Sequence, residues 1–65
     1  MNEMTSRQAA QKILDAITEI IVFYQEAARH AGSEDLAKRY EVSVDTLAVF
    51  AEELKVSIDN GEYGE

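Results

Sequence analysis

The placement of glycine and proline constrains the fold of this chain more than any other feature. The 65 residues contain no proline and only three glycines, with Gly32 at the midpoint and Gly61 and Gly64 near the end. Glycine and proline are the strongest breakers of regular local structure. Two long stretches without either residue therefore flank Gly32. Each can form a helix of about 25 residues, which is about 38 Å long at 1.5 Å per residue.

Capping signals mark where the first of these helices begins and ends. The run Thr5-Ser6-Arg7-Gln8 has the Ser/Thr-x-x-Gln spacing of a capping box, in which the Thr5 hydroxyl and the Gln8 side chain bond reciprocally to the backbone. The run His30-Ala31-Gly32 is typical of a helix end, with Gly32 free to adopt the left-handed conformation.

The second helix has its own start signal. Ser33 is a good N-cap, and Glu34 and Asp35 in the next turn face the positive end of the helix dipole. We therefore predict one domain over residues 1–65, with the following parts: a helix over about 6–31, a turn at 32–33, a helix over about 34–59 and a short acidic tail at 60–65.

Apolar residues repeat along both halves in alternating steps of three and four. They are Ala10, Ile13, Ile17, Ile20, Tyr24, Ala27 and Ala31 in the first half, and Ala37, Tyr40, Val44, Leu47, Ala51, Leu54 and Ile58 in the second. This is the a/d spacing of a coiled-coil seam. A turn this short forces the helices to run antiparallel. The sequence thus predicts an all-α fold, an antiparallel two-helix hairpin.

The first helix carries more apolar surface than one neighbour can cover. Beside the a/d seam, its e column holds Leu14, Ile21 and Ala28, and its g column holds Ala9, Ala16 and Phe23. A face of this width needs two neighbours, whereas a hairpin supplies one. We therefore predict a homodimer in which two hairpins form a four-helix bundle. The alternative is a monomeric hairpin completed by a different protein. The expected dimer interface is Leu14, Ile17, Ile21, Phe23, Tyr24, Leu47, Phe50 and Leu54.

A second apolar stripe follows the f column of the second helix, nearly opposite the seam. Val42, Val49 and Val56 lie seven residues apart there, and the f column of an ordinary bundle faces water. One interpretation is that these are scattered surface valines, which are normal singly. The other is a docking ridge with an acidic rim. The partner-binding residues predicted on this second interpretation are Val42, Val49, Val56, Asp45, Glu52 and Glu53.

The charge of the chain is acidic and unevenly distributed. Thirteen Asp and Glu against six Lys and Arg give a net charge of −7. Residues 32–65 contain nine acids and three basic residues, a net of −6, so the excess lies in the second half. Such an acidic surface can simply favour solubility. It can also complement a basic surface on a protein, or mimic nucleic acid in a basic groove. General nucleic-acid binding is disfavoured.

Basic residues gather only near the turn. Arg29, His30, Lys38 and Arg39 lie there, with acids at 34 and 35 that largely cancel their charge. The turn is thus the one place for RNA binding. For His30 itself, a place in the last turn of the first helix indicates a capping or surface role.

The sequence offers no catalytic constellation. It has no cysteine, one histidine, no nucleophile beside a base and no His-Glu-x-x-His motif. We therefore expect a non-enzymatic protein without a cofactor or metal. The longest apolar run, Ile20–Tyr24, is too short to cross a membrane, and no secretory signal is apparent. We expect a cytoplasmic protein with no membrane partner.

Two resemblances bear on function. The segments Phe23–Ala28, Leu36–Ala37 and Phe50–Leu54 resemble one hairpin of the ferritin-like superfamily. That resemblance implies a dimer with a di-iron centre, but the family's Glu-x-x-His motif is missing here. In size and layout the chain is also similar to the Rop-like family of small dimeric hairpin regulators, which implies RNA binding.

These observations favour one functional hypothesis over two alternatives. The favoured one is a small acidic interaction protein of bacterial or phage type, which binds and regulates or inhibits a protein partner through its helix surfaces. The alternatives are a carboxylate metal-binding dimer, built as a ferritin-like half-bundle, and a Rop-like RNA-binding regulator.

Overall fold

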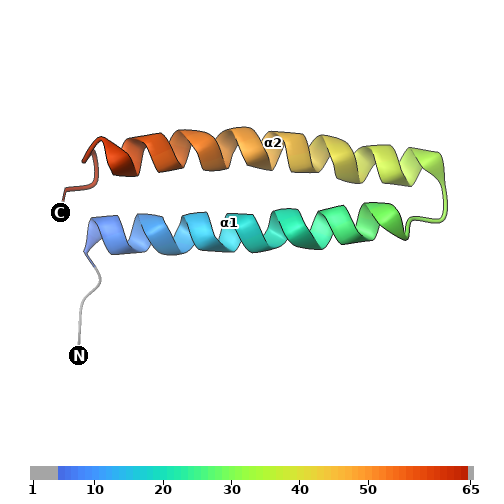
Figure 1. Ribbon diagram of the computed structural model, residues 1–65, viewed down its shortest axis with the longest axis horizontal. Helices are drawn as coiled ribbons and strands as arrows, with labels where there is room; N and C mark the ends of the chain where they lie inside the picture. The colour runs from blue at the N-terminus through green and yellow to red at the C-terminus, as the bar shows by residue number, and fades with distance from the viewer. Residues whose placement is uncertain (1–4, 65) are drawn as a thin grey trace, which may run out of the picture.

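The computed structural model describes residues 5–64 of the chain as two helices packed side by side. Helix α1 spans Ser6–Arg29 and helix α2 spans Glu34–Asp59. They run antiparallel, so the first and last described residues lie at one end and the turn at the other (Figure 1). The structure is 83% helical. The predicted all-α hairpin is confirmed.

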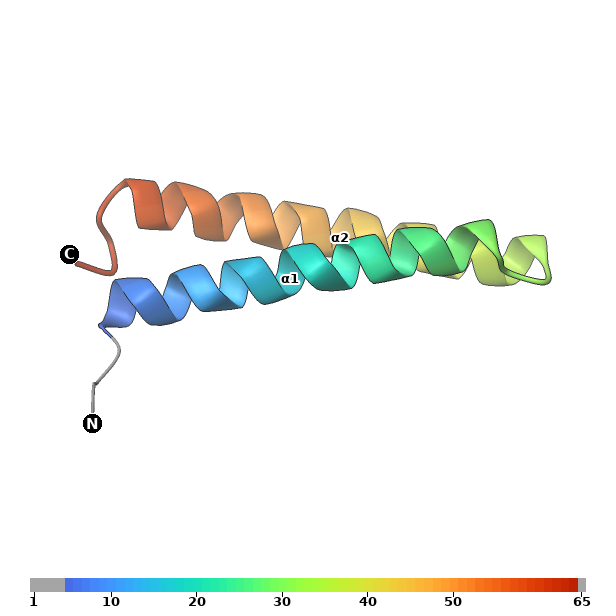
Figure 2. The same ribbon diagram turned by 60° about the horizontal axis from the view of Figure 1, so that its bottom comes forward.

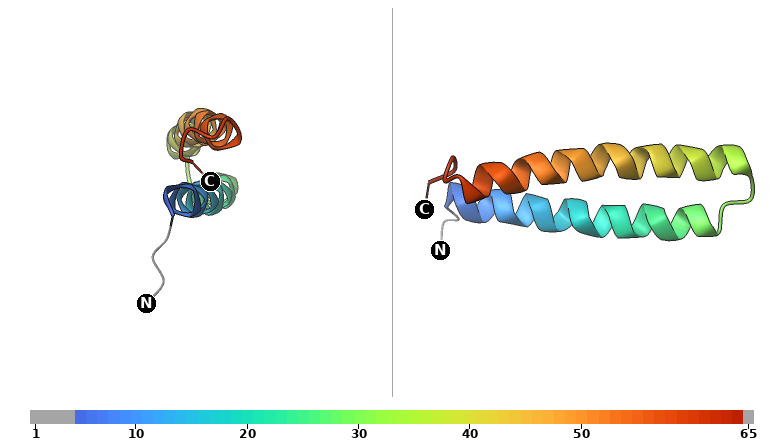
Figure 3. Two further views of the ribbon diagram at one scale, coloured as in Figure 1. Left: turned by 90° about the vertical axis from the view of Figure 1, so that its left-hand side faces the viewer. Right: turned by 45° about the horizontal axis from the view of Figure 1, so that its top comes forward.

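The hairpin forms a single layer. Its Cα atoms extend over 45 × 27 × 10 Å, which makes it elongated and about one helix thick. The two helices remain adjacent along their whole length when the molecule is turned (Figure 2), and the end-on view shows one beside the other (Figure 3). Each helix therefore has one neighbour, and both broad faces of the layer are open within the described chain.

Both predicted N-caps are present. The Thr5 hydroxyl accepts from the Gln8 backbone N–H at 3.1 Å, and the Gln8 side chain accepts from the Thr5 N–H at 3.0 Å. Together these bonds form the capping box. At α2 the Ser33 hydroxyl accepts from the Leu36 N–H at 3.2 Å. Local sequence thus determines where each helix begins.

The ends of the helices differ from the prediction at the turn. Helix α1 ends at Arg29 with His30 as its C-cap, two residues before the expected bound of 31. Gly32 is not left-handed, contrary to the prediction; the positive φ angles are at Gly61 and Gly64. Because the chain leaves the helix already at His30, the longer connection reverses direction without a left-handed residue.

A glycine in the left-handed conformation instead follows the C-terminus of α2. Gly61 has φ +78°, and its N–H bonds to the Ile58 carbonyl at 3.0 Å. The next N–H, of Glu62, reaches back to the Ser57 carbonyl at 3.0 Å. This pair of bonds is the Schellman arrangement, which satisfies carbonyls that the helix end would leave free.

The seam of α2 follows the predicted a/d columns. All seven of its residues are buried or half-buried: Ala37, Tyr40, Val44, Leu47, Ala51, Leu54 and Ile58. The most deeply buried side chains of the described hairpin are Ile58 with Ala10 and Ile17 from α1. This core lies along the line where the two helices meet.

The seam of α1 is rotated relative to the prediction. Ile13 and Ile20, expected in the seam, are 53% and 43% exposed. Leu14 and Ile21 of the e column are half-buried in their place, so the a and e columns of α1 face α2. Both pairs of columns advance in steps of three and four, which is why the spacing alone did not distinguish them.

Candidate interaction surfaces

The rotation of α1 leaves one broad face of the hairpin apolar. We call this surface the open face and define it by Ile13, Ile20, Phe23 and Phe50. Their exposed fractions are 53%, 43%, 67% and 55%. Ile13 and Ile20 lie seven residues apart on one column of α1, while Phe50 comes from α2. Exposed apolar groups in such a contiguous arrangement mark an interaction surface more often than isolated ones do.

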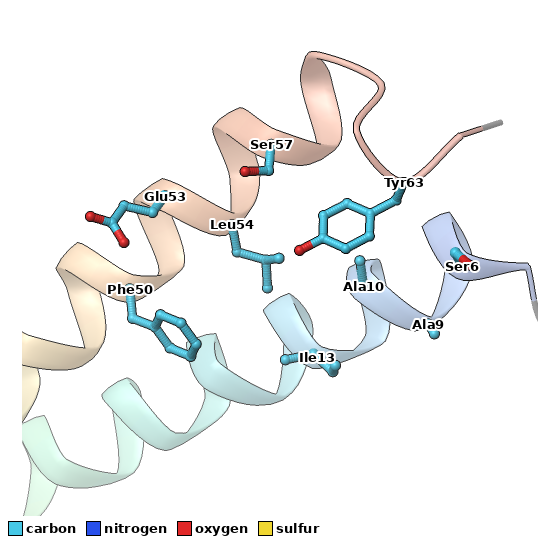
Figure 4. Close-up of a pocket in the computed structure, with 9 residues that line it drawn as sticks. All are labelled: Ser6, Ala9, Ala10, Ile13, Phe50, Glu53, Leu54, Ser57 and Tyr63. Carbon is cyan, nitrogen blue, oxygen red and sulfur yellow. The ribbon is translucent and has the colours of Figure 1, made fainter.

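A groove between the two helices runs along the open face near the chain ends (Figure 4). Phe50 and Leu54 line it from α2, and Ala10 and Ile13 line it from α1. Its remaining lining residues are Ser6, Ala9, Glu53, Ser57 and Tyr63. The groove is open along its length, so a side chain of another molecule can enter it from solvent.

Tyr63 closes the end of this groove. Its ring reaches back from the C-terminal turn toward Ala10 and Leu54 (Figure 4). The left-handed Gly61 directs the chain back over the end of the hairpin. Sequence reasoning missed Tyr63 because the tail was treated only as acidic. The signal that could have found it is an aromatic residue two positions after a C-terminal glycine.

The eight residues predicted for a dimer interface divide into three groups by exposure in this structure. Phe23 and Phe50 keep most of their surface exposed. Ile17 is buried within the single hairpin, with 6% of its surface exposed. The others are half-buried along the seam: Leu14, Ile21, Tyr24, Leu47 and Leu54. Only the two phenylalanines therefore offer a large apolar surface to a second molecule.

The valine stripe of α2 is exposed to solvent over about half or more of each side chain. We call it the valine ridge and define it by Val42, Val49 and Val56, which are 64%, 60% and 48% exposed. A shallow hollow lies along it between Val49 and Val56, and its other lining residues are Ala48, Glu52, Glu53 and Ser57. Because Glu53 and Ser57 also line the groove of the open face, the two surfaces adjoin along α2.

The acids beside the valine ridge make no ion pair within residues 5–64. Asp45, Glu52 and Glu53 are all exposed. Among the described residues, Glu26 of α1 pairs with Arg29 at 3.5 Å, and its carboxylate lies 3.8 Å from the His30 ring. None of these three carboxylates is therefore held in an ion pair by a described side chain, and each is accessible to an outside cation.

The basic residues near the turn do not form an uninterrupted patch. Glu26 lies within ion-pairing distance of both Arg29 and His30. The His30 side chain is 80% exposed, which agrees with its predicted surface role. Lys38 and Arg39 are exposed on α2. An RNA phosphate at this end would meet the Glu26 carboxylate together with the basic side chains.

Other types of site find no support in the described part of the chain. Within residues 5–64, no group of three or more His, Cys, Asp or Glu side chains is arranged to hold a metal ion. None of the helices described is long and apolar enough to cross a membrane. The surfaces that remain as candidates are the open face and the valine ridge.

Comparison with known proteins adds no functional assignment. The chain matches no protein-family model, no curated protein and no solved structure.

Proposed function

We propose that this protein is a non-enzymatic interaction protein, which assembles as a homodimer and binds a protein partner in order to regulate or inhibit it. The observation that carries the proposal is the valine ridge. Its three β-branched apolar side chains stand in one column on the outer side of α2, and about half or more of each is exposed.

Helix stability does not account for the ridge. Valine is a mediocre helix former, and at an exposed position a longer polar side chain would favour the helix more. A single exposed valine needs no explanation. Three in one column, with a hollow between two of them, form a surface on which another apolar side chain can be buried. Burial of apolar surface is the main driving force of protein association.

A second copy of the chain is the proposed occupant of the open face. The hairpin exposes 5170 Å², whereas a compact folded chain of 7.3 kDa would expose about 4200 Å². This excess of about 1000 Å² comes from the elongated shape of the whole chain, and a stable interface that buries roughly 800 Å² per partner would remove most of it. Two open faces packed together would form a four-helix bundle around Ile13, Ile20 and Phe50.

Dimerisation through the open face would leave the valine ridge accessible. The ridge lies on the outer side of α2, nearly opposite its seam, whereas the open face flanks the seam. The two surfaces meet at Glu53. In this arrangement a dimer presents two identical valine ridges, one on the outer side of each α2.

The proposal is tested by comparing three immobilised proteins as baits in an extract of the native host. Wild type is compared with Val49→Glu on the ridge and with Val22→Glu, a comparably exposed valine on α1. We expect one protein from the extract to be retained by wild type and by Val22→Glu but not by Val49→Glu. After purification, this captured protein should bind the three baits in the same pattern. Circular dichroism checks that both variants fold. If every retained protein is insensitive to Val49→Glu, the ridge is not the binding site.

A further inference from the structure

We propose that the segment which binds the valine ridge is an amphipathic α-helix that is basic along most of its length and acidic at one end. This inference rests on the proposed function and specifies the chemistry of its partner. It is carried by the distribution of charge beside the ridge together with the shape of the ridge.

The charge beside the ridge changes sign along α2. Val42 is flanked on its N-terminal side by Lys38 and Arg39, both exposed. From Asp45 onward every charged residue on the two columns that border the valines is acidic. These acids are Asp45, Glu52, Glu53 and Asp59. The two bordering columns therefore carry positive side chains near the turn, whose charge Glu34 and Asp35 largely cancel, and negative side chains over the remaining three helical turns or so.

The acidic end of the ridge is unfavourable for α2 by itself. A helix C-terminus carries a partial negative charge, which acids in the last turns oppose and cations stabilise. Helix α2 has no basic residue in its last turn, and it has Asp59 there. No ion pair within residues 5–64 neutralises the bordering acids. Lys or Arg side chains from outside would supply the missing cations.

The shape of the ridge fits a helix better than an extended segment. The three valines recur every seven residues, so the ridge follows the axis of α2 with a drift of only about 20° per heptad and is about 21 Å long at 1.5 Å per residue. A partner helix of about 14 residues or more has the same length and repeats its own apolar column at the same interval. One of its aliphatic side chains would enter the hollow between Val49 and Val56.

The test uses three synthetic 18-residue peptides that share a leucine column of heptad spacing. The matched peptide has Lys around the leucines and Glu in its last turn; a second has Glu in place of every Lys; a third has Gln in place of every charge. We expect the matched peptide to bind at least tenfold more tightly than the neutral one, and the acidic peptide not to bind. We also expect the affinity of the matched peptide to fall as the salt concentration rises from 0.05 to 0.5 M.

Protein variants show whether binding occurs at the ridge. We expect Val49→Gln to weaken binding of the matched peptide about tenfold, because one apolar contact is lost. We expect Val22→Gln on α1 to leave it unchanged. If the two variants weaken binding equally, the binding is non-specific and the inference is overturned. The inference is also overturned if the matched peptide does not bind. Equal affinity of the matched and neutral peptides would refute the charge match and leave the proposed function standing.

The change in the sign of the charge along the ridge also predicts the orientation of the partner helix. With a nitroxide label on the Glu-bearing end of the matched peptide, we expect broadening of the amide NMR signals of residues 38–42. With the label on the other end, residues 56–60 should be affected. The reverse pattern, or equal broadening at both ends, would contradict the proposed polarity.

Discussion

Tyr24 of α1 and Tyr40 of α2 face each other across the hairpin, with ring centroids 5.6 Å apart and ring planes inclined by 31°. The Phe23 ring also lies 5.8 Å from that of Tyr24. Beyond Tyr24, the only half-buried residues of α1 are alanines, at 27 and 28, and Ala31 follows in the turn. This tyrosine pair is therefore the main apolar contact between the helices in the half of the hairpin near the turn.

We predict that Tyr40→Ala lowers the free energy of unfolding by about 2 kcal/mol, because a half-buried ring and its aromatic contact are both lost. Urea unfolding followed by circular dichroism measures the change. Neither tyrosine hydroxyl makes a hydrogen bond within the described residues, so Tyr40→Phe should have the stability of wild type. A Phe variant as unstable as the Ala variant would show that the ring contact is not the stabilising feature.

The N-caps give a second stability prediction. Thr5→Ala and Ser33→Ala each remove an acceptor for a backbone N–H and should each cost about 1 kcal/mol of unfolding free energy. Ser6 is one position further on, inside the first turn, and its hydroxyl caps no N–H among the described residues, so Ser6→Ala is the matched control. The prediction fails if Ser6→Ala is as destabilising as Thr5→Ala.

The fold was predictable where the sequence pattern had one solution. Helix α2 has a single apolar seam whose neighbouring columns are mostly polar, and its seam was predicted residue by residue. Helix α1 has apolar residues in four columns, so the spacing allowed either Ile13 or Leu14 beside the common a column. Packing against α2 selects Leu14, and nothing in the periodicity of α1 alone contains that information.

The same distinction applies to the candidate surfaces. The valine ridge was recognisable in the sequence because its column is isolated from the seam. The open face was recognisable only in part, because Phe23 and Phe50 were predicted to face a second copy whereas the spacing placed Ile13 and Ile20 in the core. Tyr63 was missed for another reason: its position depends on the left-handed turn at Gly61, which brings the tail back over the groove.

If two open faces pack together in a dimer, one charged substitution on that face should disrupt the dimer. Wild type should sediment at twice its 7.3 kDa chain mass, and its midpoint of thermal unfolding should rise with protein concentration. We predict that Phe50→Glu weakens dimerisation by at least about 100-fold, because it places a charge at the centre of an apolar interface. Sedimentation equilibrium measures both proteins.

Val22→Glu serves as the control for Phe50→Glu. Val22 is also about half exposed, but it belongs to the outer f column of α1 and not to the open face. Its variant should therefore remain dimeric. A fully helical wild-type monomer at every concentration would refute the second copy as the occupant of the open face.

Two glycines in the described chain should respond oppositely to the same substitution. A Cβ added at either Gly32 or Gly61 meets no atom within 4 Å, so the effect of alanine is conformational at both positions. At Gly61 the φ of +78° strains an alanine, and we predict that Gly61→Ala costs about 1 kcal/mol of unfolding free energy. At Gly32 φ lies outside the left-handed region, and alanine restricts the unfolded chain, so Gly32→Ala should stabilise the fold by about 0.5 kcal/mol.

Urea unfolding of the two glycine variants, at one protein concentration, measures this difference of about 1.5 kcal/mol. Because Gly61 also directs Tyr63 over the groove, its variant should show increased tyrosine exposure in second-derivative absorbance, and Gly32→Ala should not. If Gly32→Ala instead destabilises the protein as much as Gly61→Ala, then Gly32 does adopt the left-handed conformation. The helix end at His30 would then be wrong.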